Sequence, residues 1–373
     1  MRRILATFAA AAVVLGLAGC ATAEASTPSA DPDCPAAATP LADLTLADDP
    51  RTVEGPSTAC LPSHAITPIA DDSEPGLPVT VTDAEGRDVE ITDVSRILPV
   101  DISGTIAATV FGLGLGDDVV GRDSSTDFDG TEALPVVTKS GHTLNAEAIL
   151  QVAPTVMLTD TSIGPKEVRQ QLREAGIAVV VVSSERRLDI AADLVAEIAA
   201  ALGVPERGKA LGARIEADIA AVEAEVSEVV PAEASDRPRM LFLYVRGSAN
   251  VYYIFGRDSG ADSLIESVGA IDVAGEIGWA GMKPMTAEAL VAAAPDVLVM
   301  MTDGLASVGG IDGLMATIPA VAQTPAGENR RVVDMADTAI LSFGPRSAEI
   351  ISALARAVYA PADSPATADE PAR

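Results

Sequence analysis

The sequence predicts an α/β protein of two related, Rossmann-like lobes that are joined by one long helix. The first observation is an internal repeat, in which "LNAEAILQVAPTVMLTD" at 144–160 resembles "MTAEALVAAAPDVLVMMTD" at 285–303 after a shift of 141 residues. The second is a helical pattern without turn signals over 206–231, between the two copies. A unit that recurs once in each half of a chain is most simply explained by two related lobes.

Each copy of the repeat predicts a helix followed by a buried strand. Asn145 and Thr286 are good N-cap residues at equivalent positions. Apolar residues then recur with the spacing of one helix face, and a proline ends each helix. The apolar runs at 156–158 and 297–299 follow as strands.

The remaining elements complete the two lobes. In chain order, we expect short strands in 93–100 and 118–122 around a helix in 103–115, a helix over 164–176 with a buried strand after it, a helix from 190 with a break near 203–205, a strand over 239–247 and a last helix over 346–359. The predicted organisation is a signal peptide at 1–19, a lipidated cysteine and tether at 20–77, lobes at 78–205 and 238–360, the linking helix at 206–231 and a polar tail at 361–373.

The first twenty residues predict export. A basic start, an apolar run and small residues before Cys20 have the pattern of a secretory signal peptide. Leu-Ala-Gly-Cys is typical of a bacterial lipobox, so we expect Cys20 to be lipidated and to anchor the protein at the extracellular face of the cytoplasmic membrane. The alternative is an ordinary signal peptide with a chance cysteine. No later apolar run is long enough to span a bilayer.

Residues 21–77 are rich in Ala, Pro, Thr, Ser and Asp and show little periodicity, so we expect a disordered tether. The pair Cys34 and Cys60 lies within this region, and outside the membrane such a pair more often forms a disulfide than a metal site. The net charge of −29 makes nucleic acid and anionic membrane surfaces poor partners. Contact with the membrane is therefore expected through the lipid anchor alone.

The chain has only two histidines, and His64 falls in the predicted tether. His142 is thus the single histidine of the predicted body. It directly precedes the first repeated helix, where it is either a ligand or a loop residue that caps the helix beginning at Asn145. Its position alone leaves both interpretations open.

The lipobox, the two repeated lobes and the single linking helix resemble the substrate-binding lipoproteins of ABC importers. The closest likeness is to the class with a rigid inter-lobe helix, which serves vitamin B12, ferric siderophores and haem. Within it, "SGHTLNAEAIL" at 140–150 and "LYVRGSANVYYIFGRDSGADSLI" at 243–265 look like the haem-binding HmuT proteins of Gram-positive bacteria. The resemblance covers roughly 78–360. It implies a ligand cleft between the lobes and ferric haem (protoporphyrin IX) as the transported ligand.

The resemblance further implies that His142 and Tyr244, one from each lobe, ligate the haem iron. Imidazole is a common haem ligand, and a phenolate oxygen suits the hard ferric ion. A free tyrosine has a pKa of about 10, so phenolate binding needs nearby positive charge. Residues i and i+2 of a strand share a face. We therefore expect Arg246 to point the same way as Tyr244 and to donate a hydrogen bond to its oxygen.

Other cleft residues are expected from the same resemblance. Met301 ends the second repeat strand, and in the related proteins a methionine here packs against haem; core filling is the equal alternative. The possible cleft wall consists of the scarce aromatic residues near the strand of Tyr244 and an arginine that could meet a propionate: Tyr252, Tyr253, Phe255, Trp279 and Arg346. Porphyrin stacking and core packing give the same sequence pattern, and Arg346 could equally be a solvated first-turn residue.

Glu147 and Glu288 occupy equivalent positions in the two repeated helices. Binding proteins of the resembled class dock on the permease through an acidic residue of each lobe. The expected partner is therefore the permease dimer of an ABC importer, with its ATPase. The alternative is that these first-turn carboxylates only stabilise the helix dipole, by about 0.3 to 1 kcal/mol each.

Two other functions compete with haem delivery. A ferric siderophore or cobalamin would suit the same class but would leave His142, Tyr244 and Arg246 together unexplained. An anchored hydrolytic or haem-dependent enzyme is a more remote alternative, because "GRDSG" at 256–260 does not match a nucleophile elbow. A single body histidine also weakens a zinc or manganese site. The sequence thus predicts a binding protein rather than an enzyme.

Overall fold

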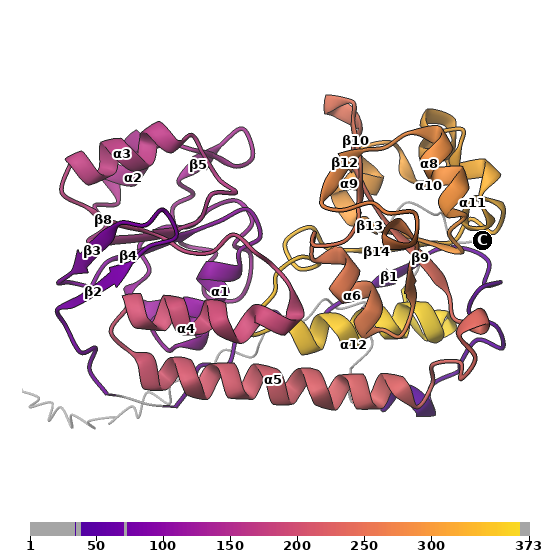
Figure 1. The fold of residues 1–373 in the computed structure, drawn as a ribbon, viewed down its shortest axis with the longest axis horizontal. Helices are drawn as coiled ribbons and strands as arrows, with labels where there is room; N and C mark the ends of the chain where they lie inside the picture. The colour runs from indigo at the N-terminus through magenta and orange to yellow at the C-terminus, as the bar shows by residue number, and fades with distance from the viewer. Residues whose placement is uncertain (1–33, 35–38, 71–72, 366–373) are drawn as a thin grey trace, which may run out of the picture.

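Two α/β lobes lie side by side above one long helix (Figure 1). The computed structural model describes Cys34, residues 39–70 and residues 73–365. The predicted fold class is confirmed: each lobe has a mainly parallel sheet between helices. Within the described ranges, no helix combines the length and the apolar character that a membrane crossing requires.

The N-terminal lobe is built on a parallel sheet of three strands in the order β4-β7-β8, with two small hairpins beside it. Its elements are β2 (Val79–Thr82), β3 (Asp88–Ile91), β4 (Ile97–Val100), α1 (Thr105–Gly112), β5 (Thr138–Lys139), β6 (Thr143–Leu144), α2 (Ala146–Gln151), β7 (Val156–Thr159), α3 (Lys166–Glu174), β8 (Ala178–Val181) and α4 (Ala191–Ala201). The predicted strand at 118–122 is wrong, because only isolated bridges form there, from Val119 to Ile97 and from Arg122 to Val136.

The C-terminal lobe has a seven-stranded sheet in the order β1-β14-β13-β9-β10-β12, with β11 paired to β9 and with β1 (Ser57–Ala59) contributed from the N-terminal part of the chain. Its elements are β9 (Arg239–Arg246), β10 (Val251–Phe255), α6 (Ala261–Ser267), β11 (Ile271–Asp272), α7 (Val273–Glu276), β12 (Met282–Pro284), α8 (Ala287–Ala293), β13 (Val297–Met301), α9 (Thr302–Ala306), α10 (Gly310–Thr317), α11 (Pro325–Glu328), β14 (Val332–Met335) and α12 (Ser347–Tyr359). Strands β9, β13 and β14 are parallel, so their carboxyl ends meet at one edge.

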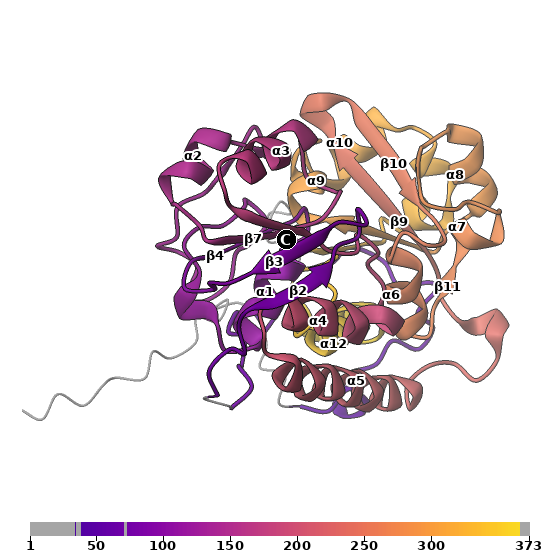
Figure 2. The ribbon, with the colours of Figure 1, turned by 60° about the vertical axis from the view of Figure 1, so that its left-hand side comes forward.

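The long helix α5 (Pro205–Ser227) has 23 residues and therefore spans about 35 Å. It packs against both lobes. Leu211 and Ile215 belong to the core of the N-terminal lobe, whereas Val222 and Val226 belong to that of the C-terminal lobe. Figure 2 shows α4, α5 and α12 together below the sheets. One continuous helix thus fixes both lobes from the same side.

The repeat predicted from the sequence is present in the backbone. α2 and β7 in the first lobe correspond to α8 and β13 in the second. Ala153 and Ala294 stand at equivalent positions after the helices, and both adopt left-handed backbone angles, with φ of 43° and 44°. Each helix therefore turns into its strand through the same conformation.

The predicted disordered tether is wrong over residues 39–70. β1 (Ser57–Ala59) pairs in parallel with β14 and forms the edge of the C-terminal sheet. Leu41, in a short 3-10 helix, is 2% exposed and belongs to the same core cluster. A disulfide joins Cys34 to Cys60. The segment folds because its few apolar side chains find a partner surface on the distant α5, α12 and β14.

Candidate ligand-binding cleft

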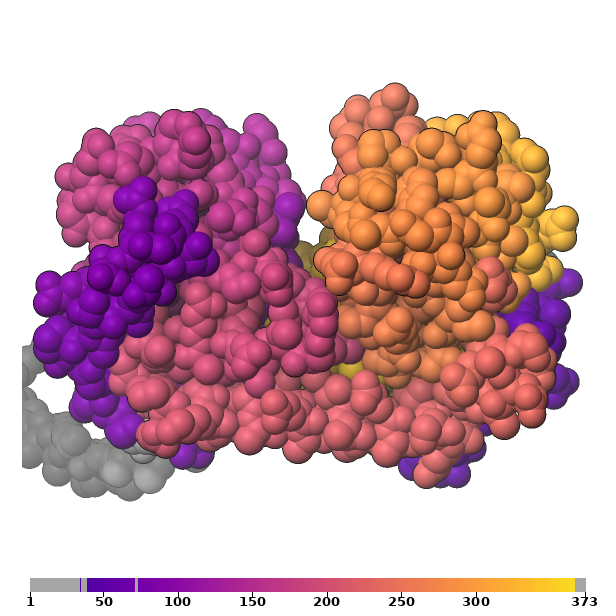
Figure 3. Space-filling view, viewed as in Figure 1, coloured from indigo at the N-terminus to yellow at the C-terminus, as the bar shows by residue number. Residues whose placement is uncertain are grey.

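A cleft opens between the two lobes on the side away from α5 (Figure 3). In the same view of the ribbon, β5 lies on the N-terminal side of this cleft, and α9 and β10, which pairs with β9, lie on the C-terminal side (Figure 1). His142 is the last residue of the turn between β5 and β6, and Tyr244 lies near the end of β9. The fold therefore brings the two predicted iron ligands, 102 residues apart in the sequence, to facing walls.

His142 is presented by a tight turn. Ser140 and Gly141 adopt left-handed φ values of 49° and 83° between β5 and β6. A Cβ added to Gly141 would meet no atom within 4 Å, so the space beside the turn is open. His142 itself is half-buried, and its Nδ1 lies 3.5 Å from the Oγ of Ser125.

The charges around His142 come from both lobes. Burial lowers the pKa of His142, and the positive charge of Arg246 on the opposite wall lowers it further, whereas Asp101 and Asp337 act in the other direction. Arg246 and Asp337 belong to the C-terminal lobe, so charges on the opposite side of the cleft change the pKa of the imidazole. A lowered pKa keeps the imidazole neutral, which is the form that binds a metal.

Arg246 lies on the same face of β9 as Tyr244. Its guanidinium carbon stands 4.9 Å from the centre of the Tyr244 ring, within the range of a cation–π contact. The guanidinium also forms an ion pair with Asp337, and it lies 3.9 Å from the sulfur of Met301. Arg246 therefore covers the face of the Tyr244 ring, and its guanidinium donates to the Val245 carbonyl oxygen and to Asp337. The predicted hydrogen bond from Arg246 to the phenol oxygen is not formed.

Sequence reasoning missed Asp337. This residue lies two positions after the end of β14, whose carboxyl end is at the same edge of the sheet as those of β9 and β13. The rule that ligand-binding residues gather at the carboxyl ends of parallel strands could have identified it. Asp337 also accepts a hydrogen bond from the backbone N–H of Asp303, at 2.9 Å.

The aromatic residues divide between the two faces of the sheet. Phe255 stacks on Tyr244 with the ring centres 5.8 Å apart, and Tyr253 lies 6.5 Å from the same ring. Tyr252 and Trp279 pack in the cluster on the opposite face. Their prediction as cleft wall beside Tyr244 is therefore wrong. Tyr252 alternates with Tyr253 along β10, so the two side chains point to opposite faces. Trp279 lies outside β10 and packs against the same cluster as Tyr252.

Met301 and Arg346, both predicted near the ligand, lie in different surroundings. Met301 lies on the same face of the sheet as Tyr244 and belongs to a buried core cluster, whereas Met300 is fully buried in the cluster on the other face. Arg346 is 4% exposed, and its guanidinium donates to the carbonyl oxygen of Ser63 at 3.3 Å. A buried and engaged guanidinium is not available to a propionate in the cleft, so that prediction is corrected.

Buried carboxylates gather at the carboxyl ends of the strands in the N-terminal lobe. Asp101 and Asp160 follow β4 and β7, and Arg186 forms an ion pair with each, at 3.3 and 2.5 Å. Asp123 is fully buried, and burial together with the negative charge of Asp101 raises its pKa to about 7. One guanidinium and several backbone N–H groups thus stabilise three acidic side chains at this edge.

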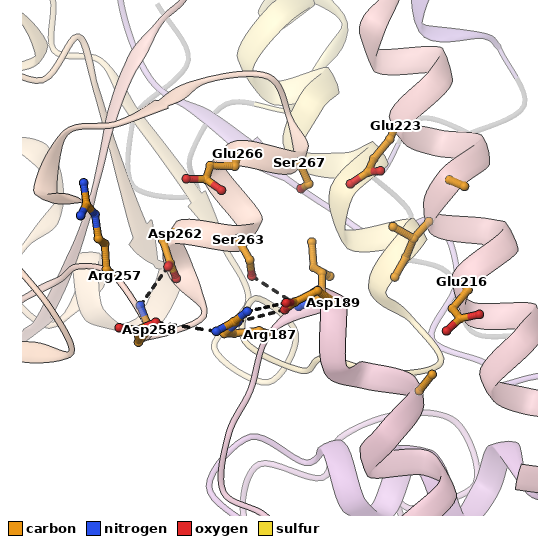
Figure 4. Close-up of a pocket in the computed structure, with 14 residues that line it drawn as sticks. Arg187, Asp189, Glu216, Glu223, Arg257, Asp258, Asp262, Ser263, Glu266 and Ser267 are labelled. Atoms are coloured by element: carbon orange, nitrogen blue, oxygen red, sulfur yellow. Dashed lines mark hydrogen bonds and ion pairs between the residues drawn. The ribbon is translucent and has the colours of Figure 1, made fainter. Parts of the chain in front are cut away.

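A second hollow, of about 640 Å³, lies between α5, α6 and the segment before α4 (Figure 4). Arg187 bridges Asp189 and Asp258 within it. The lining carries six carboxylates and two guanidinium groups: Asp189, Glu216, Glu223, Asp258, Asp262, Glu266, Arg187 and Arg257. An excess of negative charge repels an anionic ligand, and neither His142 nor Tyr244 lines this hollow. It is therefore not the predicted cleft.

The candidate docking residues are exposed on both lobes. Glu147 and Glu288 lie in the first turns of α2 and α8. Both helices lie at the top of Figure 1, the end at which the cleft opens in the space-filling view (Figure 3). The predicted cap of Thr286 is present, because its Oγ1 accepts from the N–H of Ala289 at 3.2 Å, but the Asn145 side chain makes no such bond.

The predicted lipidation site, Cys20, lies outside the described residues. In the described part of the chain, no group of three or more His, Cys, Asp or Glu side chains is arranged to hold a metal ion.

Two lobes on one long helix, with facing side chains across a cleft, define the chain as a two-lobed binding protein. The model of the periplasmic binding protein family matches residues 100–339, and the chain belongs to this family. No curated protein matches the chain.

Several solved structures are similar to this chain. A crystal structure of the heme-binding protein HmuT is 44% identical, with a TM-score of 0.79, and the match covers 83% of this chain and 99% of that one. The periplasmic heme-binding protein RhuT from Roseiflexus sp. RS-1 is 36% identical, with a TM-score of 0.64 and coverage of 73% and 100%. The heme-binding protein BhuT, in complex with two hemes, is 30% identical, with a TM-score of 0.59 and coverage of 70% and 98%.

Proposed function

We propose that this protein captures ferric haem in the cleft between its lobes and delivers it to an ABC importer. The observation that carries the proposal is the pairing of His142 on one wall with Tyr244 and Arg246 on the other. The charge of Arg246 reaches the imidazole across the cleft. A flat macrocycle between the walls would have nitrogen and oxygen donors on opposite sides, which is how haem iron takes two axial ligands.

The charges of the site suit phenolate ligation. Tyr244 gives the ferric ion a hard oxygen donor, and Arg246 supplies a positive charge at its ring. Asp337 holds that guanidinium and partly offsets its charge. The carboxylate of Asp337 thus limits how strongly Arg246 stabilises the phenolate.

The similar structures support haem as the ligand. HmuT, RhuT and BhuT are named heme-binding proteins, and structures of HmuT variants replace one histidine, one tyrosine and one arginine by alanine. The replaced tyrosine and arginine are two residues apart, as are Tyr244 and Arg246 here. His142, Tyr244 and Arg246 thus match the kinds of residue that were replaced there.

Delivery follows from the position of the repeated helices. Glu147 and Glu288 are exposed at the cleft end of the two lobes and offer two matched negative charges to the two subunits of a permease. The protein works outside the cytoplasmic membrane, anchored through a lipid on Cys20. Because α5 packs in both cores, we infer a small change of the angle between the lobes rather than a wide closure. No covalent chemistry is involved, so the protein acts as a carrier and not as an enzyme.

The test is a ligand titration followed by visible absorption. The chain from Ala21 onward, which keeps both Cys34 and Cys60, is titrated with ferric haem, a ferric hydroxamate siderophore and cobalamin. The proposal predicts a saturable Soret shift with haem at 1:1 stoichiometry and no saturable binding of the other two. Saturable binding of a siderophore or cobalamin without a Soret shift would contradict it.

A further inference from the structure

We infer that Ser125 is a positioning residue that fixes the tautomer of His142, so that Nε2 is the nitrogen offered to the cleft. This inference rests on the proposed function, in which His142 is a ligand, and extends it to a residue that never touches the iron. It follows from where the single hydroxyl hydrogen of Ser125 goes.

The hydroxyl of Ser125 has a better acceptor than His142. Its Oγ donates to the carbonyl oxygen of Ile102 at 2.7 Å, the usual length of an O–H···O bond. A serine hydroxyl has one hydrogen to give and two lone pairs to accept with. With the hydrogen committed to Ile102, the Oγ meets Nδ1 of His142 as an acceptor, at 3.5 Å.

The imidazole must therefore be the donor in this contact. A neutral imidazole carries its hydrogen on one nitrogen only. Placing it on Nδ1 of His142 leaves a lone pair on Nε2, the form in which Nε2 binds a metal. Among the described residues, none forms a hydrogen bond with Nε2. A contact at 3.5 Å is longer than the usual N–H···O bond of about 2.7 to 3.2 Å, so its effect is to select a tautomer rather than to hold the ring in place.

Ser125 itself is held rigidly. The buried carboxylate of Asp123 accepts from the backbone N–H of Ser125 at 2.8 Å, of Thr126 at 2.7 Å and of Asp101 at 2.9 Å. Gly104, with φ of 71°, packs against the same loop, where an added Cβ would stand 2.8 Å from the carbonyl oxygen of Ser125. The acceptor thus has a fixed place before any ligand arrives.

The neighbouring serine supports the same hairpin in another way. Ser124 is exposed, and its Oγ donates to the carbonyl oxygen of Gly141 at 2.9 Å. It therefore steadies the backbone beside His142 without touching the ring. Ser124 and Ser125 form a matched pair of variants, since each replacement by alanine removes one hydroxyl from the same loop.

The tautomer is measured first, without haem, so that the result does not depend on the proposed ligand. Nitrogen-15 labelling of histidine gives only two imidazoles in this chain, and His142→Ala assigns them. At a pH where His142 is neutral, we expect mainly the Nδ1–H form in the unmodified protein and a shift toward Nε2–H, the form that free histidine prefers, in Ser125→Ala. Ser124→Ala should keep the Nδ1–H form. A mainly Nε2–H imidazole in the unmodified protein, or no shift in Ser125→Ala, overturns the inference.

Haem titration of the same variants provides the second readout. Removing the partner of a metal ligand typically weakens binding 10- to 100-fold, and because the contact is long we expect about 10-fold for Ser125→Ala and less than 3-fold for Ser124→Ala. If the unmodified protein does not bind haem but the tautomer depends on Ser125, the proposed function fails and the assignment of the tautomer stands. If haem binds and both variants bind it equally, the positioning role of Ser125 is refuted.

Discussion

Replacing Arg246 by alanine should weaken the binding of ferric haem by about 10- to 30-fold. The guanidinium carbon is 4.9 Å from the centre of the Tyr244 ring. If the charge of the phenolate is placed at the ring centre, two unit charges at that distance interact by about 3 kcal/mol at an effective dielectric constant near 20. The Arg246 side chain is 29% exposed and Asp337 opposes its charge, so roughly half of this energy remains for the phenolate. About 1.5 to 2 kcal/mol corresponds to the stated factor.

The assay is a haem titration of Arg246→Ala, Arg246→Lys and Asp337→Asn beside the unmodified protein. Lysine keeps the charge but loses the planar group over the ring, so its loss should be smaller than that of alanine. Asp337→Asn removes the opposing carboxylate and should tighten binding a few fold. If Arg246→Ala binds haem with unchanged affinity, or if Asp337→Asn weakens binding as much as Arg246→Ala does, this account of the charges is refuted.

Three further predictions test other parts of the account. Leu41→Ala, in the segment that was predicted to be disordered, should lower the free energy of unfolding by about 2 to 4 kcal/mol in a urea titration, because the side chain is 2% exposed; no change would mean that the segment does not pack. The pKa of His142 lies below its ordinary value of 6.5, so haem affinity should persist as the pH falls and then be lost with a midpoint below 6.5. Removing the charge of Arg246 raises that pKa and should move the midpoint upward, and an unmoved midpoint would contradict the contact across the cleft. Charge reversal of Glu147 and Glu288 to lysine should abolish haem-stimulated ATPase activity of the reconstituted importer with haem affinity unchanged; full stimulation would exclude the docking role.

The sequence predicts the helices and strands whose apolar residues recur at a regular short spacing. The helix-then-strand units and α5 follow from apolar spacing, which depends on neighbours a few residues away. The shared face of Tyr244 and Arg246 follows from the alternation of a strand in the same way.

What the sequence missed depends on contacts between distant residues. β1 has three residues and no periodicity, and it is a strand only because β14, more than 270 residues further on, offers an edge. The pairing of Tyr253 with Tyr244 places Tyr252 on the far face of the sheet, where Trp279 also packs, and composition does not reveal this pairing. Asp337 can be identified as the partner of Arg246 only when the strand order is known, because that order brings the ends of β9 and β14 to the same edge of the sheet.

The central claim is that His142 and Tyr244, one from each lobe, ligate the same haem iron. The most direct measurement is electron paramagnetic resonance and visible absorption of the ferric haem complex, in the unmodified protein, in His142→Ala and in Tyr244→Ala. The account predicts a tyrosinate charge-transfer band that survives in His142→Ala and disappears in Tyr244→Ala, with an imidazole signature that shows the reverse pattern. Identical spectra in all three proteins would contradict ligation of the iron by both residues.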